Sequence, residues 1–262
     1  MKLNKQTLSE QIYQILRSDI LSQRIPSGTK LTLKTLTARF EVSSTPIREA
    51  LTRLSEEQLV SYYSNIGVNV MELTRSDISE IYQFMGDLDA LAIKYAAQSE
   101  NIQELVKELS GNISAAENAL NNINANKKHT SEANKTNSNE YEYNTHDDGS
   151  AVRYTSYPPL AAAHGNETSY LNDFIKLSDE FHLIFYKYCN NSRLTRSAER
   201  MRSQMSIAAY QYEQNTDNLN PIHEEHVAIY KSFADGKHDE AVELMRLHMQ
   251  HSMQYALELT SN

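Results

Sequence analysis

Three histidines in the C-terminal half of the sequence, His182, His226 and His248, each lie on the apolar face of a different predicted helix. Neutral imidazole is the commonest metal ligand in proteins, and a helical bundle can collect such ligands from facing helices. Asp179, three residues before His182, adds a carboxylate from nearly the same face. Three histidines and one carboxylate suit Zn²⁺, Ni²⁺ or Mn²⁺, so we predict a divalent-metal site. For any single histidine, an ordinary core position is the simpler interpretation.

A second group of candidate residues lies in the segment EVSSTPIREALTRL, residues 41–54. Ser44 or Thr45 can cap a helix over residues 45–57, and proline is well tolerated in the first turn. Four apolar residues at helical spacing form the buried face: Ile47, Ala50, Leu51 and Leu54. Thr45, Arg48 and Thr52 lie off that face. They place a cation and two hydroxyls near a helix N-terminus, which is chemistry suited to nucleic acid.

The basic residues of this region divide into two predicted roles. Arg48 can donate two hydrogen bonds to guanine O6 and N7, which reads the base. Lys34 and Arg53 are better placed to contact phosphates, which positions a protein on DNA without reading its sequence. For Arg53 and for Arg39, a simple solvated charge is an equally good interpretation.

Motifs for catalysis are missing from the sequence. The chain has seven glycines and no glycine-rich phosphate loop, and it lacks the G-x-S-x-G, H-E-x-x-H and C-x-x-C patterns. The HEEH segment at residues 223–226 places its histidines three residues apart, which is not the zinc-protease spacing. We therefore expect a protein that is not an enzyme.

Charge is distributed unevenly along the chain, although the net charge is −9. Residues 1–71 carry nine Lys and Arg against six Asp and Glu, and the remainder carries 16 against 28. A mildly basic N-terminal part on an acidic body is compatible with nucleic-acid binding. Cys189 is the only cysteine, and neither a membrane-spanning run nor a signal peptide is visible, which favours the cytoplasm.

The N-terminal elements predict a winged helix-turn-helix over residues 1–72. Aliphatic residues at helical spacing predict helices over 7–24 and 32–40, followed by the helix at 45–57. The run LVSYYSNIGVNVME is rich in strand-forming residues and predicts a small β-hairpin with its turn at Ser64–Gly67. In such a unit the helix after the turn enters the major groove of DNA.

Residues 73–262 predict an antiparallel all-helical bundle, so the fold class is mainly α. The first helix is capped by Thr74 or Ser76, and the others are expected near 100–122, 169–190, 192–213, 221–235 and 238–258. Residues 123–168 are polar and Asn-rich, and they predict a disordered insertion. An alternative is a lid or partner-binding segment that uses its tyrosines: Tyr141, Tyr143, Tyr154 and Tyr157.

The motifs in both halves resemble those of one bacterial family. The segment GTKLTLKTLTARFEVSSTPIREALTRLSEEQLV resembles the winged helix of GntR-family transcription regulators. The segments DISEIYQFMGDLDALAIKYAA, DEFHLIFYKYCNNSRL and EEHVAIYKSFADGKHDEAVELMRLHM resemble the FadR-type C-terminal ligand-binding (FCD) domain. The resemblance covers most of the chain except residues 123–168.

The resemblance implies a homodimer that binds a palindromic operator and responds to a small carboxylate. Arg48 and Thr45 match DNA-contacting positions, Lys34 matches a basic position on the preceding helix, and the three histidines match metal ligands.

Four positions depart from the family pattern. Ser44 replaces an arginine before the T-P pair, and Ser178 replaces an aspartate, with Asp179 one residue later. Met85 replaces an arginine of the bundle, and Asp89 replaces a glutamate.

Three functions are compatible with these features. The favoured one is a DNA-binding repressor whose bundle senses a small metabolite with the help of a metal. A constitutive DNA-binding dimer with a degenerate effector site is the second, and the changes at Met85 and Ser178 favour it. A metal-dependent enzyme that uses the three histidines is the third.

Overall fold

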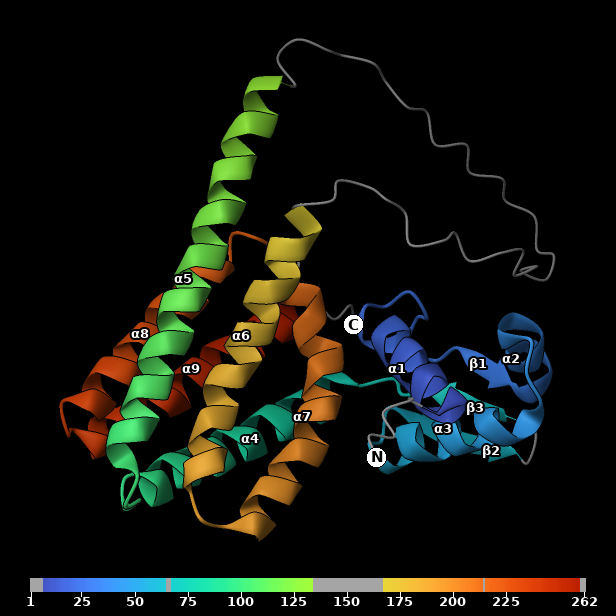
Figure 1. The fold of residues 1–262 in the computed structure, drawn as a ribbon, viewed down its shortest axis with the longest axis horizontal. Helices are drawn as coiled ribbons and strands as arrows, with labels where there is room; N and C mark the ends of the chain where they lie inside the picture. The colour runs from blue at the N-terminus through green and yellow to red at the C-terminus, as the bar shows by residue number, and fades with distance from the viewer. Residues whose placement is uncertain (1–6, 65–66, 134–166, 214, 260–262) are drawn as a thin grey trace, which may run out of the picture.

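The computed structural model describes residues 7–64, 67–133, 167–213 and 215–259. These residues form a small N-terminal unit, which we call the head (residues 7–70), and a larger helical bundle (residues 75–259) beside it (Figure 1). The mainly α fold with an N-terminal winged helix is thus confirmed. The head contains α1 (Leu8–Leu21), β1 (Lys30–Thr32), α2 (Leu33–Phe40), α3 (Ser44–Glu56), β2 (Val60–Ser64) and β3 (Gly67–Val70).

The sheet of the head has three antiparallel strands in the order β1-β3-β2. Its hairpin, β2 and β3, agrees with the prediction, whereas the edge strand β1 was not predicted. β1 spans only three residues, too few for an alternating pattern, and it forms because Leu31 is buried opposite Val68 of β3. A short strand of this kind depends on a partner distant in sequence, so local periodicity cannot reveal it.

Helix α3 buries the predicted residues Ile47, Ala50, Leu51 and Leu54. Its N-cap is Ser43, which makes no side-chain cap hydrogen bond, so the prediction of Ser44 or Thr45 as the cap was wrong. Pro46 occupies the third helical position. The first four N–H groups of a helix have no partner within it, and proline is therefore tolerated there too.

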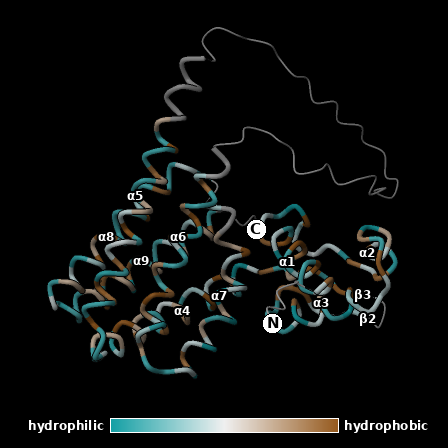
Figure 2. The backbone as a smooth tube through the Cα atoms, viewed as in Figure 1, coloured by the Kyte–Doolittle hydropathy of each residue, from teal (hydrophilic) through white to brown (hydrophobic). Residues whose placement is uncertain are grey.

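The described residues of the bundle form six helices that pack around one hydrophobic core. Helix α4 contacts α6, α7 and α9, while α5 contacts α6 and α8. Hydrophilic and hydrophobic positions alternate along these helices (Figure 2), as expected when each buries one face. Their bounds are α4 (Arg75–Ala96), α5 (Ile102–Ala133), α6 (Glu167–Tyr188), α7 (Ser192–Glu213), α8 (Leu219–Ala234) and α9 (His238–Leu259).

The observed ends of the bundle helices test two of the predictions. Thr74 caps α4 through a capping box with Asp77, as one of the two predicted caps. The predicted disordered insertion at 123–168 is wrong at both ends, because α5 continues through Ala133 and α6 begins at Glu167. Its remaining part, residues 134–166, lies outside the described residues. Ile123 is buried in the bundle core and extends the apolar face beyond the predicted end. The four tyrosines of the alternative lie outside the described residues.

The head and the bundle meet where α1 packs against α7. Ile207 of α7 is 3% exposed and belongs to the hydrophobic core of the head rather than to that of the bundle. On the same helix, Ser203 donates a hydrogen bond of 3.4 Å to Glu57, the residue after α3. The division into domains at residues 72 and 73 stays a prediction. Among the described residues, no helix is both long and apolar enough to cross a membrane.

Replacing Ile207 by alanine should destabilise the protein by anchoring α7 less firmly in the head. Removal of a buried isoleucine side chain costs about 2–5 kcal/mol in free energy of unfolding. The matched control is Leu247→Ala, since Leu247 is 47% exposed. Chemical denaturation followed by circular dichroism measures both. Equal, small losses for the two variants would contradict the placement of Ile207.

Candidate metal centre and nucleic-acid interface

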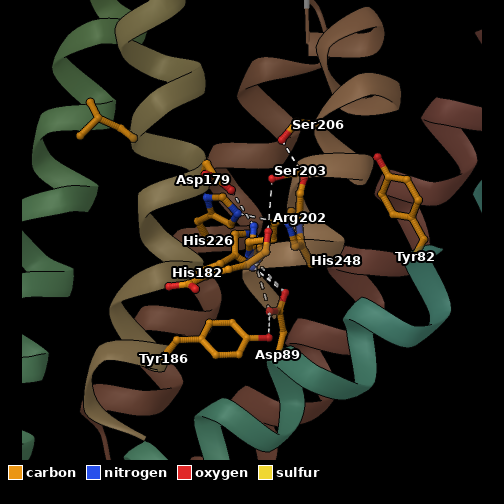
Figure 3. A network of polar contacts seen from close by, with 12 residues as sticks. Tyr82, Asp89, Asp179, His182, Tyr186, Arg202, Ser203, Ser206, His226 and His248 are labelled. Atoms are coloured by element: carbon orange, nitrogen blue, oxygen red, sulfur yellow. Dashed lines mark hydrogen bonds and ion pairs between the residues drawn. The ribbon is translucent and has the colours of Figure 1, made fainter. Parts of the chain in front are cut away.

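The three predicted histidines converge in the bundle core from α6, α8 and α9 (Figure 3). His182, His226 and His248 are each 5% exposed or less. One ring nitrogen from each lies within 4.8 Å of the others. The Nε2 atoms of His226 and His248 are 3.2 Å apart. Two nitrogens bound to one tetrahedral Zn²⁺ at about 2.0–2.1 Å would be separated by about 3.3 Å. The donor set therefore fits a divalent metal.

Carboxylates orient two of the three imidazoles. The Nδ1 atom of His182 lies 2.9 Å from Asp89, and that of His248 lies 2.7 Å from Glu225. A carboxylate that accepts a hydrogen bond from one ring nitrogen fixes the tautomer and leaves the other nitrogen free to bind a metal. His226 is held differently: Phe181 stacks on its ring with centroids 4.3 Å apart. The arrangement supplies preoriented imidazoles.

The electrostatics of the site keep two of these imidazoles neutral. Burial lowers the pKa of His182 to about 4, and the nearby charge of Arg202 adds to this effect. Burial also lowers the pKa of His226 well below its usual value. A metal ligand must be deprotonated, so both side chains are in the state that coordination requires.

Asp89 of α4 is the buried carboxylate behind this cluster. It accepts hydrogen bonds from Tyr186 at 2.6 Å and from Arg202 at 3.1 Å, in addition to its contact with His182. Burial raises the pKa of Asp89, but the charge of Arg202 and the hydrogen bonds from His182 and Tyr186 outweigh burial and leave the pKa lowered. Asp89 therefore remains ionised and satisfied inside the core.

Asp179, the predicted fourth metal ligand, does not join the histidines. Its carboxylate accepts a hydrogen bond of 2.7 Å from Arg202, and its side chain is 46% exposed. The position three residues before His182 brings it to the same side of α6, but α7 supplies a cation that holds it at the rim. The expected carboxylate contribution comes from Asp89 instead, as a partner of His182.

Sequence reasoning missed the roles of Asp89 and Arg202. Each lies on an otherwise apolar stripe: Asp89 between Met85 and Ile93 on α4, and Arg202 between Ala198 and Met205 on α7. A lone charge on a buried helical face requires a partner, because an unpaired charge is costly there. That signal is visible in the sequence, but which two charges pair is not.

An interdomain cavity of about 220 Å³ opens beside the histidine cluster. His182, His248 and Arg202 line it from the bundle, and Arg17 and Leu21 of α1 line it from the head. The remaining lining residues are Tyr82, Asn172, Ile175, Lys176, Ser178, Asp179, Met205, Ser206, Ala209, Tyr212, Ile222, Met249 and Ser252.

The predicted DNA-contacting face of the head lies at the surface. Ser44, Thr45, Arg48 and Thr52 of α3 are exposed, and so is Lys34 of α2. The Thr52 hydroxyl donates to the Arg48 carbonyl at 2.9 Å, which keeps Thr52 close to its own helix. In a helix-turn-helix unit the second helix enters the major groove of DNA, so this face stays the predicted DNA contact.

Arg53 does not share that face. Its guanidinium forms an ion pair with Glu10 of α1 and lies over the ring of Tyr13, with 3.8 Å between the guanidinium carbon and the centroid. These contacts tie α3 to α1, so the position does not fit the predicted DNA contact. Tyr62 of β2 was missed: it is 53% exposed, and its hydroxyl lies 3.3 Å from that of Thr52.

Comparisons with known families match both parts of this architecture. Residues 8–70 match the family described as bacterial regulatory proteins, gntR family, and residues 160–251 match the FCD domain. The chain belongs to the GntR family. Both matched families are those of transcriptional regulators rather than enzymes, in agreement with the prediction that the chain is not an enzyme.

Individual relatives are similar over part of this GntR-family chain. The gluconate operon transcriptional repressor of Bacillus licheniformis is 38% identical over 95 residues, which is 36% of this chain and 38% of that protein. The transcriptional repressor RspR of Escherichia coli K12 is 37% identical over 73 residues, 28% of this chain and 32% of that protein. The chain thus matches less than half the length of these relatives.

Solved structures share the fold over nearly the whole GntR-family chain. Escherichia coli McbR/YncC superposes with a TM-score of 0.65 at 16% identity, covering 96% of this chain and 98% of that one. The Listeria monocytogenes protein Lar superposes with a TM-score of 0.59 at 14% identity, covering 98% and 100%. At these identities the likeness supports the fold alone.

Replacing His226 by glutamine should remove most of the bound metal, because the remaining two imidazoles cannot hold the ion as tightly. His223→Gln is the matched control: His223 is also buried on α8, but it lies outside the cluster. Metal content of protein loaded with Zn²⁺ and then dialysed gives the readout. Equal metal retention by both variants would refute the site.

Stability of the metal-free protein should fall as the pH drops from about 6.5 to about 4. The His182 pKa is lowered in the folded state, so the unfolded chain binds more protons in this window and acid favours unfolding. The contribution is up to roughly 3 kcal/mol. His182→Gln should show a shallower slope in denaturation at several pH values. Identical slopes would mean that His182 does not titrate differently on folding.

Proposed function

We propose that this GntR-family chain represses transcription by binding operator DNA through α3, and that a small carboxylate and a metal in the bundle control this binding. The observation that carries the proposal is the placement of Arg48. Its helix is anchored by four buried aliphatic residues, and Arg48 itself is exposed on the opposite face. The names of the relatives, which are repressors, support the negative sign of regulation.

Recognition of DNA would divide between reading and positioning contacts. Arg48 can donate two hydrogen bonds to one guanine, worth about 1–3 kcal/mol of discrimination. Lys34 and the exposed hydroxyls of Ser44 and Thr45 suit phosphate contacts, and Tyr62 extends the same face onto the wing hairpin. One head reads few base pairs, so we propose a homodimer on a palindromic operator. Binding to the bacterial chromosome places this function in the cytoplasm.

Sensing would take place in the bundle. His182, His226 and His248 would hold the metal, with Asp89 and Glu225 fixing two of the rings. A bound divalent ion supplies positive charge that attracts a carboxylate. Arg202 supplies a second cation, which stands in for the one lost at Met85. The presence of Arg202 argues against a degenerate effector site. The metal we propose is Zn²⁺, Ni²⁺ or Mn²⁺.

The response to an effector would be a shift between two packings of the bundle. Helix α7 carries Arg202 at the site and Ile207 in the core of the head, so movement of α7 reaches both. Allosteric couplings of this kind are typically about 1–3 kcal/mol. A packing favoured by the effector would change how far apart the two recognition helices of a dimer lie.

Replacing Arg48 by alanine should weaken binding to the operator more than binding to random DNA. Loss of one guanine contact should reduce specific affinity by about 1–3 kcal/mol, or roughly 5- to 150-fold. Operator fragments selected from random sequence, titrated in a fluorescence anisotropy assay at fixed salt, provide the measurement. Arg246→Ala, on the surface of the bundle, is the control. An equal loss on random DNA would show that Arg48 touches phosphates only.

A further inference from the structure

The interdomain cavity draws part of its wall from the DNA-binding head. Arg17 and Leu21 belong to α1, whereas the histidines, Arg202 and most other lining residues belong to the bundle. A molecule in this cavity therefore touches both parts of the chain at once. The volume of about 220 Å³ is below the 300–1,000 Å³ of typical ligand pockets, so the occupant is a small molecule.

The charges on the cavity wall favour an anion. Arg17, Lys176 and Arg202 line it, against a single carboxylate, that of Asp179. A metal on the histidine cluster would increase the positive charge further.

One buried donor in this wall lacks a protein partner. The Nε atom of Arg202 has no hydrogen-bond partner among the residues that the structure describes, although both terminal nitrogens of the same guanidinium bind carboxylates. Arg202 is 4% exposed, so bulk water does not satisfy this atom. Buried donors in native proteins are almost always paired, and an oxygen atom from a ligand would complete this one.

Arg17 can exchange its present partner, Glu57, for such a ligand, because Glu57 keeps other hydrogen-bond donors. Its Nε lies 3.0 Å from Glu57, and its side chain is 34% exposed. Glu57 also accepts hydrogen bonds from Tyr13 of α1 and from Ser203 of α7, next to Arg202. A partly exposed ion pair of this kind contributes little to stability, so an anion in the cavity can compete with Glu57 for Arg17.

We propose that Arg17 binds the anionic group of a small oxyanion ligand in the interdomain cavity, in competition with Glu57. The ligand is a carboxylate or an inorganic oxyanion, and the inference rests on the proposed effector-sensing function. When Arg17 turns to the ligand, Glu57 loses its cation while still holding Tyr13 and Ser203. Binding in the cavity and the contact between head and bundle are thereby coupled, so that a change in one shifts the other.

The test is calorimetric titration of the Zn²⁺-loaded full chain with succinate and, separately, with sulfate. Arg17→Gln should weaken binding about tenfold or more, because a hydrogen-bonded charge pair is lost. Glu57→Gln should strengthen it several-fold, because the competitor for Arg17 loses its charge but keeps its hydrogen-bond geometry. The arm that binds more tightly identifies a carboxylate or an inorganic anion as the preferred chemistry.

Two controls isolate the local effect from overall charge. Arg24→Gln removes a cation of the head that pairs with Asp19 outside the cavity, and Glu56→Gln removes the exposed acid next to Glu57. Both should leave the affinity within a factor of about two. Circular dichroism checks that each variant folds.

Arg17→Gln and Glu57→Gln are expected to change the affinity for the anion in opposite directions. Loss of a purely structural ion pair would change it in the same direction. Weakening by both Arg17→Gln and Glu57→Gln, or no effect of Arg17→Gln, would overturn the inference. Failure of both anions to bind the wild-type chain would also overturn it. None of these results depends on operator binding through Arg48, so the inference and the DNA-binding function fail separately.

Discussion

The ion pair between Asp89 and Arg202 is the constraint around which the bundle is arranged. Both groups are buried, and a buried charge that loses its partner costs about 3–5 kcal/mol. Asp89 comes from α4 and Arg202 from α7, while Tyr186 and His182 of α6 complete the carboxylate's hydrogen bonds. These contacts fix three helices relative to one another, and they determine which nitrogen of His182 faces the other histidines.

The same arrangement gives the proposed site both a set of imidazoles and a cation, although Met85 stands where the family pattern has an arginine. Arg202 brings positive charge from a different helix, and it also draws Asp179 away from the histidines. Glu225 plays a similar part on the other side, where burial raises its pKa but hydrogen bonds from His248 and His251 leave it lowered. Carboxylates thus act mainly as partners that orient imidazoles, not as members of the histidine cluster.

Helix α7 links the chemistry of the bundle to the position of the head. Within six residues it contributes Arg202 to the buried ion pair, Ser203 to Glu57, and Ile207 to the core of the head. A rigid helix cannot move at one of these points without moving at the others. Regulation through such an element needs only a small shift, since packed interfaces switch between discrete arrangements.

Local pattern in the sequence determined much of this protein. Periodicity and capping residues predicted the helices of the head, the buried face of α3, the hairpin and most of the bundle, because those features depend on neighbours within a few residues. The same periodicity singled out the three histidines and Arg48, and the family resemblance matched them to metal ligands and a DNA contact. The tertiary structure alone decided that Asp89 pairs with Arg202, that Asp179 and Arg53 are tied to other side chains, and that α1 closes the cavity. The ion pairs among these outcomes join groups 23 to 113 residues apart, and such pairing is set by the packing of whole helices.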